Sequence, residues 1–433
     1  MIDVLKPALA LALLAPLVTV SVIGVWSILS DDRPSEERVT RIIGTGLGAS
    51  VLGSVLVLAR FLGLLGAPVR GDIDFGDWLR IDDFFIPAVL LIDQVSVSIS
   101  LFAAFVTALI ARFSRTYLHK EAGFIRFFTL LAIFATGTQL VAFAGALELF
   151  FAGWELLGIS SAFFIGFFHE RAEPVRSSIR AFATYRLSDA GLLIATVATL
   201  QLLGTARFSA FGTAAALPPL QATAVALLFL ISAMGKSAQL PFSGWLPRAM
   251  EGPTPSSALF YGAVSIHAGL FLLLRVWPLL EVSMVARSIG VAVGLSTAVY
   301  ATLVVRVHTD AKGALAHATL SQVGLILAEI CLGWTSLALA HLICHAFLRL
   351  GQYLKAPNTI HDSHRLGHAT HSPSWLDRLS PGFAARVYAA SLHRLRLDDR
   401  IDQAFAPVMW LATTFHRVDV WWRRVISLDR TDA

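Results

Sequence analysis

Long apolar runs, separated by short polar stretches, repeat along most of the chain. Eleven runs are long enough to cross a hydrocarbon layer of ~30 Å as helices. They cover residues 3–29, 42–66, 90–113, 124–145, 147–168, 178–203, 221–246, 254–279, 286–306, 313–332 and 335–355. The first run is too long for a cleaved signal peptide and lacks a polar cleavage region, so we expect it to be retained. The pattern predicts an all-α, polytopic membrane helix bundle of about 11 transmembrane helices.

The pattern changes abruptly after residue 355. Residues 356–433 hold ten Arg and eight Asp, or 18 charged residues in 78, against 45 in the preceding 355. From 401 to 428, aromatic and aliphatic residues mix with arginines, which suits a helix at the lipid headgroups or against protein. This tail is therefore not predicted to form a twelfth span. We expect the segment from about 375 to 428 to dock a soluble partner, and a helix that rests only on lipid is the alternative.

Composition agrees with a membrane protein and excludes several other classes. Apolar residues make up 56% of the 433 residues and charged residues only 15%, whereas soluble domains carry about 25% charged residues. The net charge is +5, from 34 basic and 29 acidic residues, but no basic stripe interleaved with aromatics indicates nucleic-acid binding. Cys331 and Cys344 are the only cysteines, too few for a disulfide framework or a cysteine metal site.

The basic residues of the loops predict an orientation. Alternate connections, counted from the first loop, carry thirteen Lys and Arg, and the opposite connections carry six. Because cytoplasmic loops favour Lys and Arg, we place the richer side and the tail in the cytoplasm of a bacterial inner membrane, with the N-terminus outside. The loop at 67–89 is acidic and is expected to face outward.

Ionisable residues within spans are functional candidates, since a charge at bilayer depth is costly. Glu148 and Glu155 are seven residues apart and share a face of the fifth span. Arg186 and Asp189 in the sixth span are three apart and can form a local ion pair. For Glu148 a structural role is as plausible as a functional one, and for the Arg186–Asp189 pair an electrostatic staple is as plausible as gating.

Lys236 lies in the middle of an apolar run and is followed by Pro241. Proline removes a backbone donor and predicts a broken helix, which at membrane depth needs protein or water around it. A lysine in such a place readily changes its protonation. We expect Glu155 and Lys236 to be coupled across a hydrated cavity near the membrane midplane.

Histidines form two further groups. In the eleventh span His341, His345 and Arg349 follow one another at intervals of four, which aligns them along one stripe. Metal binding by the two histidines is possible, but no Glu or Asp ligand is expected beside them, and we favour a hydrated proton wire. In the tail His361, His364, His368 and His371 are weaker metal candidates, because Gly367 and Ser372-Pro373 argue against a helix there. The chain has no phosphate loop, dinucleotide fingerprint or haem-ligand pair, so no cofactor is predicted.

Several motifs resemble those of the antiporter-like proton-channel subunits of respiratory complex I, in particular the L subunit, and of the related Mrp-type antiporters. They are Phe151-Ala152-Gly153-Trp154-Glu155-Leu156-Leu157-Gly158, Gly235-Lys236-Ser237-Ala238-Gln239-Leu240-Pro241, Trp245-Leu246-Pro247, residues 250–259 and 309–324, and His341 to Arg349. The resemblance covers roughly residues 90–350. It implies that Glu155 and Lys236 form a proton-loading pair and that His341 and His345 lead to a second half-channel.

The sequence departs from that family at three places. Tyr261 stands where the family commonly has a histidine, with His267 six residues later, and Arg349 replaces a lysine. The chain also becomes hydrophilic after Lys355, so the second broken helix of the family is not expected. Shortened L-like subunits are similar as well to the membrane partner of bacterial inorganic-carbon accumulation complexes.

With the resemblance, the chain divides into four predicted parts. These are N-terminal spans (1–123), a first five-helix repeat (124–280), a truncated inverted repeat (281–355) and the tail (356–433). The predicted function is proton or cation translocation as a subunit of a larger energy-coupling complex, with no redox chemistry in this chain. The alternatives are energy coupling for an inorganic-carbon pump and a non-conducting membrane scaffold for a soluble partner.

Overall fold

The computed structural model describes residues 4–29, 34–82, 84–308, 310–356 and 381–428. The chain divides into two compact units, residues 1–369 and 370–433, and each is described by itself. Within the described residues, eleven helices are long and apolar enough to cross a membrane. The prediction of an all-α polytopic bundle is confirmed.

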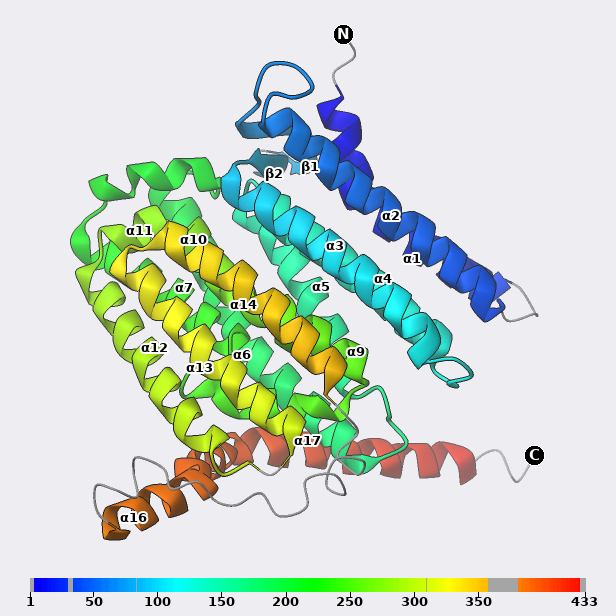
Figure 1. The fold of residues 1–433 in the computed structure, drawn as a ribbon, viewed down its shortest axis with the longest axis vertical. Helices are drawn as coiled ribbons and strands as arrows, with labels where there is room; N and C mark the ends of the chain where they lie inside the picture. Colours follow the sequence, from blue (N-terminus) through cyan, green and yellow to red (C-terminus); the bar gives the residue numbers. More distant parts are fainter. Residues whose placement is uncertain (1–3, 30–33, 83, 309, 357–380, 429–433) are drawn as a thin grey trace. The chain divides into compact units, whose positions relative to one another are not determined.

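The helices of the first unit run antiparallel to their neighbours in the chain (Figure 1). The spanning helices are α1 (Leu5–Leu29), α2 (Glu36–Phe61), α3 (Gln94–Tyr117), α4 (Phe124–Phe143), α5 (Leu147–Ile165), α6 (Ala172–Leu203), α7 (Pro219–Lys236), α12 (Met284–Val305), α13 (Ala311–Leu332) and α14 (Thr335–Lys355), together with a composite eighth span, Thr254–Arg275. In the eighth span 94% of the residues of its apolar 18-residue stretch are buried, a larger share than in any other span of the described residues. It therefore lies in the core, where lipid does not reach it.

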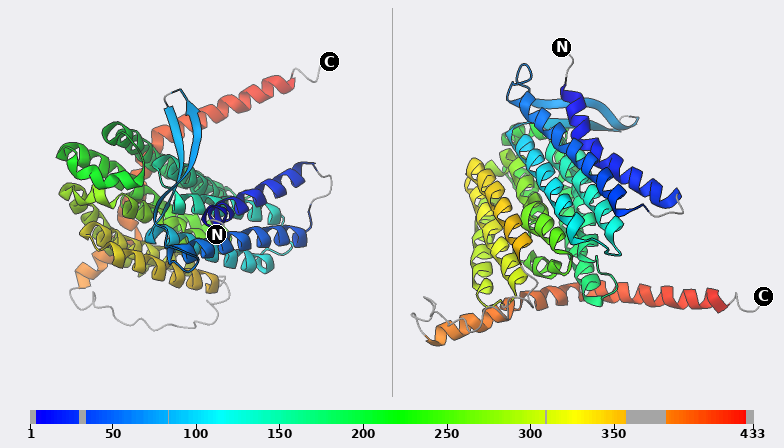
Figure 2. Two further views of the ribbon diagram at one scale, coloured as in Figure 1. Left: turned by 90° about the horizontal axis from the view of Figure 1, so that it is seen from above. Right: turned by 45° about the vertical axis from the view of Figure 1, so that its right-hand side comes forward.

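The acidic loop is not a simple loop but a β-hairpin, which the sequence analysis did not predict. Strands β1 (Gly71–Ile81) and β2 (Phe84–Ile92) pair antiparallel, with register shifts between Asp74 and Leu79. The hairpin extends away from the helices (Figure 2). Because β2 continues to Ile92 and Asp93 caps α3, the third span begins at Gln94 rather than at 90.

Helix α7 ends at Lys236, ten residues before the predicted end of the seventh span. The chain then unwinds through η2 (Phe242–Gly244), α8 (Trp245–Arg248) and η3 (Ala249–Glu251). Protein groups satisfy this segment: the Trp245 indole donates to the carbonyl of Gly235 at 3.0 Å, and the Leu240 amide donates to the Thr297 hydroxyl at 3.1 Å. The expected break is thus present, and the irregular backbone finds the partners that it needs at membrane depth in a side chain of the segment itself and in Thr297 of α12.

The eighth span changes its winding three times. It begins with α9 (Thr254–Ser256), widens into the π-helical η4 (Ser257–Ala263), tightens in η5 (Ser265–His267) and ends as α10 (Ala268–Arg275). Widened turns of this kind are frequent at functional sites. They set the directions of Tyr261 and His267 in a way that a regular helix would not.

The remaining elements are short connections and the tail. Segments η1 (Phe208–Ala216) and α11 (Trp277–Glu281) link spans of the first unit. The second unit contains α16 (Pro381–Leu392), η7 (Arg394–Arg396) and α17 (Leu397–Leu428). Large apolar residues at 411, 415, 418, 422 and 425 of α17 are exposed. Their spacing of four and three places them on one side of this helix, so α17 is amphipathic.

Candidate functional site

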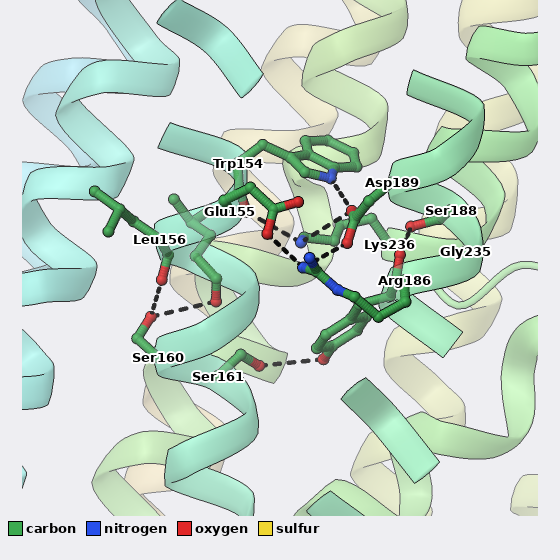
Figure 3. Close-up of polar contacts among 12 residues, drawn as sticks. Trp154, Glu155, Leu156, Ser160, Ser161, Arg186, Ser188, Asp189, Gly235 and Lys236 are labelled. Atoms are coloured by element: carbon green, nitrogen blue, oxygen red, sulfur yellow. Dashed lines mark hydrogen bonds and ion pairs between the residues drawn. The ribbon is translucent and has the colours of Figure 1, made fainter. Parts of the chain in front are cut away.

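Four charged side chains from three helices meet inside the bundle (Figure 3). Glu155 comes from α5, Arg186 and Asp189 from α6, and Lys236 from the last turn of α7. The Arg186 Nη2 lies 2.5 Å from Glu155 Oε2 and 2.7 Å from Asp189 Oδ2. Lys236 Nζ lies 3.9 Å from Asp189 Oδ1. The two acids and two bases thus form one connected cluster, called here the ion cluster.

Lys236 is enclosed by protein on every side, with 1% of its side chain exposed. Its ammonium donates to the carbonyl of Trp154 at 3.2 Å and lies over the rings of Trp154 and Tyr185, at 4.7 and 4.8 Å from their centroids. A Cβ at Gly158 would stand 2.8 Å from Nζ. The glycine therefore makes room for the lysine, and the aromatic faces partly replace the lost water.

Glu155 and Lys236 do not pair directly. Arg186 joins Glu155 to Asp189, and Asp189 joins Arg186 to Lys236, so the contacts that connect the two residues run through the i, i+3 pair of α6. The Trp154 indole also donates to Asp189. Asp189 therefore has three competing partners, whereas one oxygen of Glu155, Oε1, is buried with no hydrogen-bond partner among the described residues.

A chain of hydroxyl groups leads away from Lys236. Tyr185, whose ring lies under the ammonium, is 3.1 Å from the Ser161 hydroxyl, which is 3.4 Å from the Tyr261 hydroxyl of η4. Tyr261 also donates to the Ser161 carbonyl at 3.3 Å. The sequence analysis included Tyr261 but missed Tyr185 and Ser161. Neutral hydroxyl residues are common within spans and gave no signal.

The second cluster, called here the histidine chain, has a defined direction. Arg349 Nε donates to His345 Nε2 at 3.1 Å, so the proton of a neutral His345 is on Nδ1. That nitrogen lies 3.0 Å from His267 Nε2 and donates to it, and His267 Nδ1 in turn donates to the carbonyl of Ala263 at 2.8 Å. We assign these tautomers from the hydrogen-bond partners. Each member donates in the same direction, from Arg349 to Ala263.

His341 is in contact with a carboxylate, contrary to the sequence-based expectation. Its Nδ1 lies 2.9 Å from Glu329 Oε1 of α13, and its Nε2 lies 3.1 Å from Gln322 Oε1. The error arose because Glu329 is close to His341 in space but belongs to another span. Glu329 could have been found from the sequence, because a carboxylate inside an apolar span is itself a sign of a functional residue. Among the described residues, no three groups are arranged to hold a metal ion.

The other predicted residues lie apart from these clusters. Glu148 is in the first turn of α5, two turns from Glu155, and its Oε2 is buried with no hydrogen-bond partner in the described part of the chain. His361, His364, His368 and His371 lie outside the described residues. A cavity of about 30 Å³ borders His267 and Leu157. That volume admits about one water molecule.

Comparison with known proteins identifies the family. The model described as NADH:quinone oxidoreductase/Mrp antiporter, TM matches residues 144–376, and the model described as NADH-Ubiquinone oxidoreductase (complex I), chain 5 N-terminus matches residues 78–128. NADH-quinone oxidoreductase subunit L of Mycobacterium tuberculosis is 32% identical over 329 residues, which are 75% of this chain and 52% of the relative. NAD(P)H-quinone oxidoreductase chain 5 of Picosynechococcus is 30% identical over 322 residues, 72% and 48% of the two chains. The chain spans about half the length of these relatives.

Solved structures agree with this result. The Mrp complex from Dietzia contains a chain that is 25% identical, with a TM-score of 0.69 over 88% of this chain and 40% of that one. The archaeal membrane-bound sulfane sulfur reductase shares the fold, with a TM-score of 0.68 and 18% identity over 80% and 70% of the two chains. The family model covers more than half of the chain. The chain therefore belongs to the transmembrane family shared by NADH:quinone oxidoreductases and Mrp antiporters.

Proposed function

We propose that this chain translocates protons as a membrane subunit of a larger energy-coupling complex. The observation that carries the proposal is the sharing of Asp189 between Arg186 and the buried Lys236. A proton that arrives at or leaves Lys236 changes the charge beside Asp189 by one unit. At a separation of 3.9 Å in a site with little water, such a change outweighs the same change at a protein surface.

The cluster can convert that charge change into a rearrangement. When Lys236 is charged, it competes with Arg186 for Asp189, and Arg186 can move toward Glu155, which it already contacts at 2.5 Å. When Lys236 is neutral, Asp189 is left to Arg186 and the Trp154 indole. Protonation of Lys236 and the position of Arg186 are therefore linked. This is the property required of a loading site that receives and releases one proton per cycle.

The histidine chain supports a path onward from this site. Two neutral histidines joined donor to acceptor can pass a proton when one is delivered to His345 Nε2 and another leaves from His267 Nδ1, which requires Arg349 and the Ala263 carbonyl to release those two nitrogens. His341 lies beside them, with a ring-centroid distance of 6.3 Å to His345. Arg349 holds its proton too firmly to relay it. We therefore assign Arg349 the role of orienting His345, and we assign relay roles to His267, His345 and His341.

The proposal is tested in the complex that copurifies with the full chain, reconstituted into vesicles and followed by a pH-sensitive dye. Glu155→Gln and Lys236→Ala should each abolish coupled proton movement while the complex still assembles. The matched controls Glu170→Gln and Lys355→Ala change exposed residues of the same types and should keep it. Normal pumping by either cluster variant would show that the relay is wrongly assigned and would favour a scaffold role.

We further propose that the complex lies in a bacterial inner membrane and that the loops with thirteen Lys and Arg face the cytoplasm. The tail docks a soluble subunit on that side. The relatives are subunits of quinone oxidoreductases and the structural neighbours belong to multi-subunit membrane complexes, which supports partners of this general kind. The identity of the copurifying soluble subunit decides the home complex. A quinone-reducing partner supports a respiratory role, and a carbon-hydrating partner supports an inorganic-carbon pump.

A further inference from the structure

A cavity opens between α2 and α3 at the end of the bundle where both helices carry basic residues. Its volume is about 240 Å³, and its lining includes Gly44 and Gly48 of α2, Ala108 of α3, Phe128 of α4, and two arginines, Arg112 and Arg115. The walls are apolar and the arginines stand at one end. We call this feature the α2–α3 groove.

The groove lies between two points at which α2 is attached to its neighbours. At the helix start, Glu36 accepts hydrogen bonds from the Lys120 amide at 2.8 Å and from His119 at 2.7 Å. Deeper in the bundle, the hydroxyls of Ser54 and Ser100 are 2.9 Å apart. The helices are thus held together above and below the groove, and the opening is part of the folded structure.

The floor of the groove is made by residues without side chains. A Cβ built at Gly44 or at Gly48 would meet nothing within 4 Å, and both glycines are exposed. The space beside them is therefore open, unlike that beside Gly53 on the same helix, where a Cβ would stand 2.5 Å from the backbone of α1. An apolar chain can lie along this floor without displacing any protein atom.

The charge of the two arginines in the lining is a second feature that points to a ligand, independently of the shape of the cavity. Both are exposed, and among the described residues neither Arg112 nor Arg115 has a hydrogen bond or ion pair. Nearby arginines differ: Arg41 pairs with Glu37 at 2.5 Å, and Arg126 donates to the carbonyl of Phe167 at 2.8 Å. Two uncompensated cations at the membrane edge call for anionic oxygens.

We infer that the α2–α3 groove binds an anionic phospholipid. Its phosphate lies against Arg112 and Arg115, and one acyl chain lies over Gly44 and Gly48. The combination of an apolar channel and paired cations at the headgroup level fits a lipid with a negative headgroup better than a neutral lipid. Basic pockets between spanning helices on the cytoplasmic side are known to hold such headgroups.

The test uses the purified full-length chain, stripped of lipid in detergent. Binding of phosphatidylglycerol, phosphatidylcholine and inorganic phosphate is measured by native mass spectrometry. We expect phosphatidylglycerol to bind more tightly than phosphatidylcholine. The double variant Arg112→Gln/Arg115→Gln should lower its affinity by about 25-fold, since each cation contributes about fivefold, and Arg112→Lys/Arg115→Lys should retain most of it.

Variants of the glycines in the floor distinguish the contribution of the acyl chain to binding from that of the headgroup. Gly48→Leu fills the open space and should weaken the binding of both lipids. Two control variants should leave the binding of both lipids unchanged: Gly24→Leu on α1, which also has open space around it, and Arg176→Gln. Equal binding of the two lipids, or binding of inorganic phosphate as tight as that of phosphatidylglycerol, overturns the inference. The inference is also overturned if Gly48→Leu leaves lipid binding unchanged but loses a partner subunit from the complex that copurifies with the full chain, because the groove is then a protein interface. An unchanged melting temperature confirms that each variant is folded.

Discussion

Asp189 is the residue on which the ion cluster depends. Only 4% of its side chain is exposed, yet it faces Arg186, Lys236 and the Trp154 indole at once. Glu155 is partly exposed and has Arg186 as its cationic partner. The carboxylate of Asp189 therefore compensates the buried lysine, and when Lys236 and Arg186 are both charged the cluster is neutral if both acids are ionised.

We predict that Asp189→Asn destabilises the protein by about 3–5 kcal/mol, the usual cost of removing one partner of a buried ion pair. The cost arises because Lys236 keeps its burial and loses its nearest anion. Thermal unfolding in detergent measures it. The double variant Asp189→Asn/Lys236→Met should recover most of the stability and none of the proton transport. If the double variant is no more stable than Asp189→Asn, Lys236 does not depend on Asp189 for its charge balance.

At the scale of residues, the sequence predicted the charged residues but not most of their partners on other helices. Glu155, Arg186, Asp189 and Lys236 stood out because charge is rare inside apolar runs, and the structure brings all four together. The i, i+3 rule predicted the Arg186–Asp189 contact. Spacing along one helix says nothing about other helices, however, so it did not predict that Glu329 lies beside His341 or that His345 lies beside His267.

At the scale of elements, the hairpin is fastened to η1 by polar contacts. Arg207 pairs with Asp74 at 3.0 Å, and the Ser209 hydroxyl donates to Asp72 at 2.6 Å. An isolated two-stranded hairpin is marginally stable in water. These contacts, together with the packing of β2 against α3 to α5, therefore decide how firmly the base of the hairpin is held.

We predict a pH dependence for this attachment. The hydrogen bond from the Gly76 amide and the contact with Arg207 lower the pKa of Asp74 from its ordinary value of 3.8. Because the pKa of Asp74 is lower in the folded state, its contact stabilises the attachment fully at a pH above the ordinary pKa of the carboxyl. This contribution is lost as the pH falls through the lowered pKa of the folded state. At neutral pH, Asp74→Asn should raise hydrogen exchange in β1 by no more than about fivefold, because exposed pairs contribute at most about 1 kcal/mol.

The control for this prediction is Asp77→Asn, which breaks a contact with Arg80 inside the hairpin and none with η1. It should leave exchange at the base of the hairpin unchanged. The difference between the natural chain and Asp74→Asn should vanish in acid, after correction for intrinsic exchange rates. A difference that persists below the pKa of the carboxyl would mean that backbone packing, and not the ion pair, holds the hairpin.

The elements themselves were predicted where the apolar pattern is regular. All eleven spans are present, and Pro241 correctly indicated a break in the seventh. The pattern failed where winding changes without a change in composition. The run from Ser257 to His267 is apolar enough for an ordinary helix, and its widened turn contains Gly262, which packs so closely against Tyr353 of α14 that a Cβ would stand 2.8 Å from the ring. The hairpin was missed because its acidic, glycine-containing first strand has the composition of a loop.

At the scale of the whole molecule, the first unit holds the ion cluster and the histidine chain, and the second unit holds the amphipathic helix α17. The apolar side of α17 exposes large residues, among them Phe415 at 71% and Trp422 at 56%. Arginines and aspartates occupy much of the rest of this helix. Such a helix is stable in water only when a membrane surface or a protein covers its apolar side.

We predict that removal of residues 370–433 releases the soluble partner and stops proton transport, while the first unit remains inserted and folded. The division of the chain after residue 369 is the physical reason, because the spanning helices and both clusters lie before it. Copurification of the partner, vesicle transport and the melting temperature are measured on the same preparation. Phe415→Ser/Trp422→Ser in the full chain should mimic the deletion by removing the apolar side alone, whereas Thr414→Ala on the same helix should not. A shortened chain that keeps both partner and transport would show that the tail rests only on lipid.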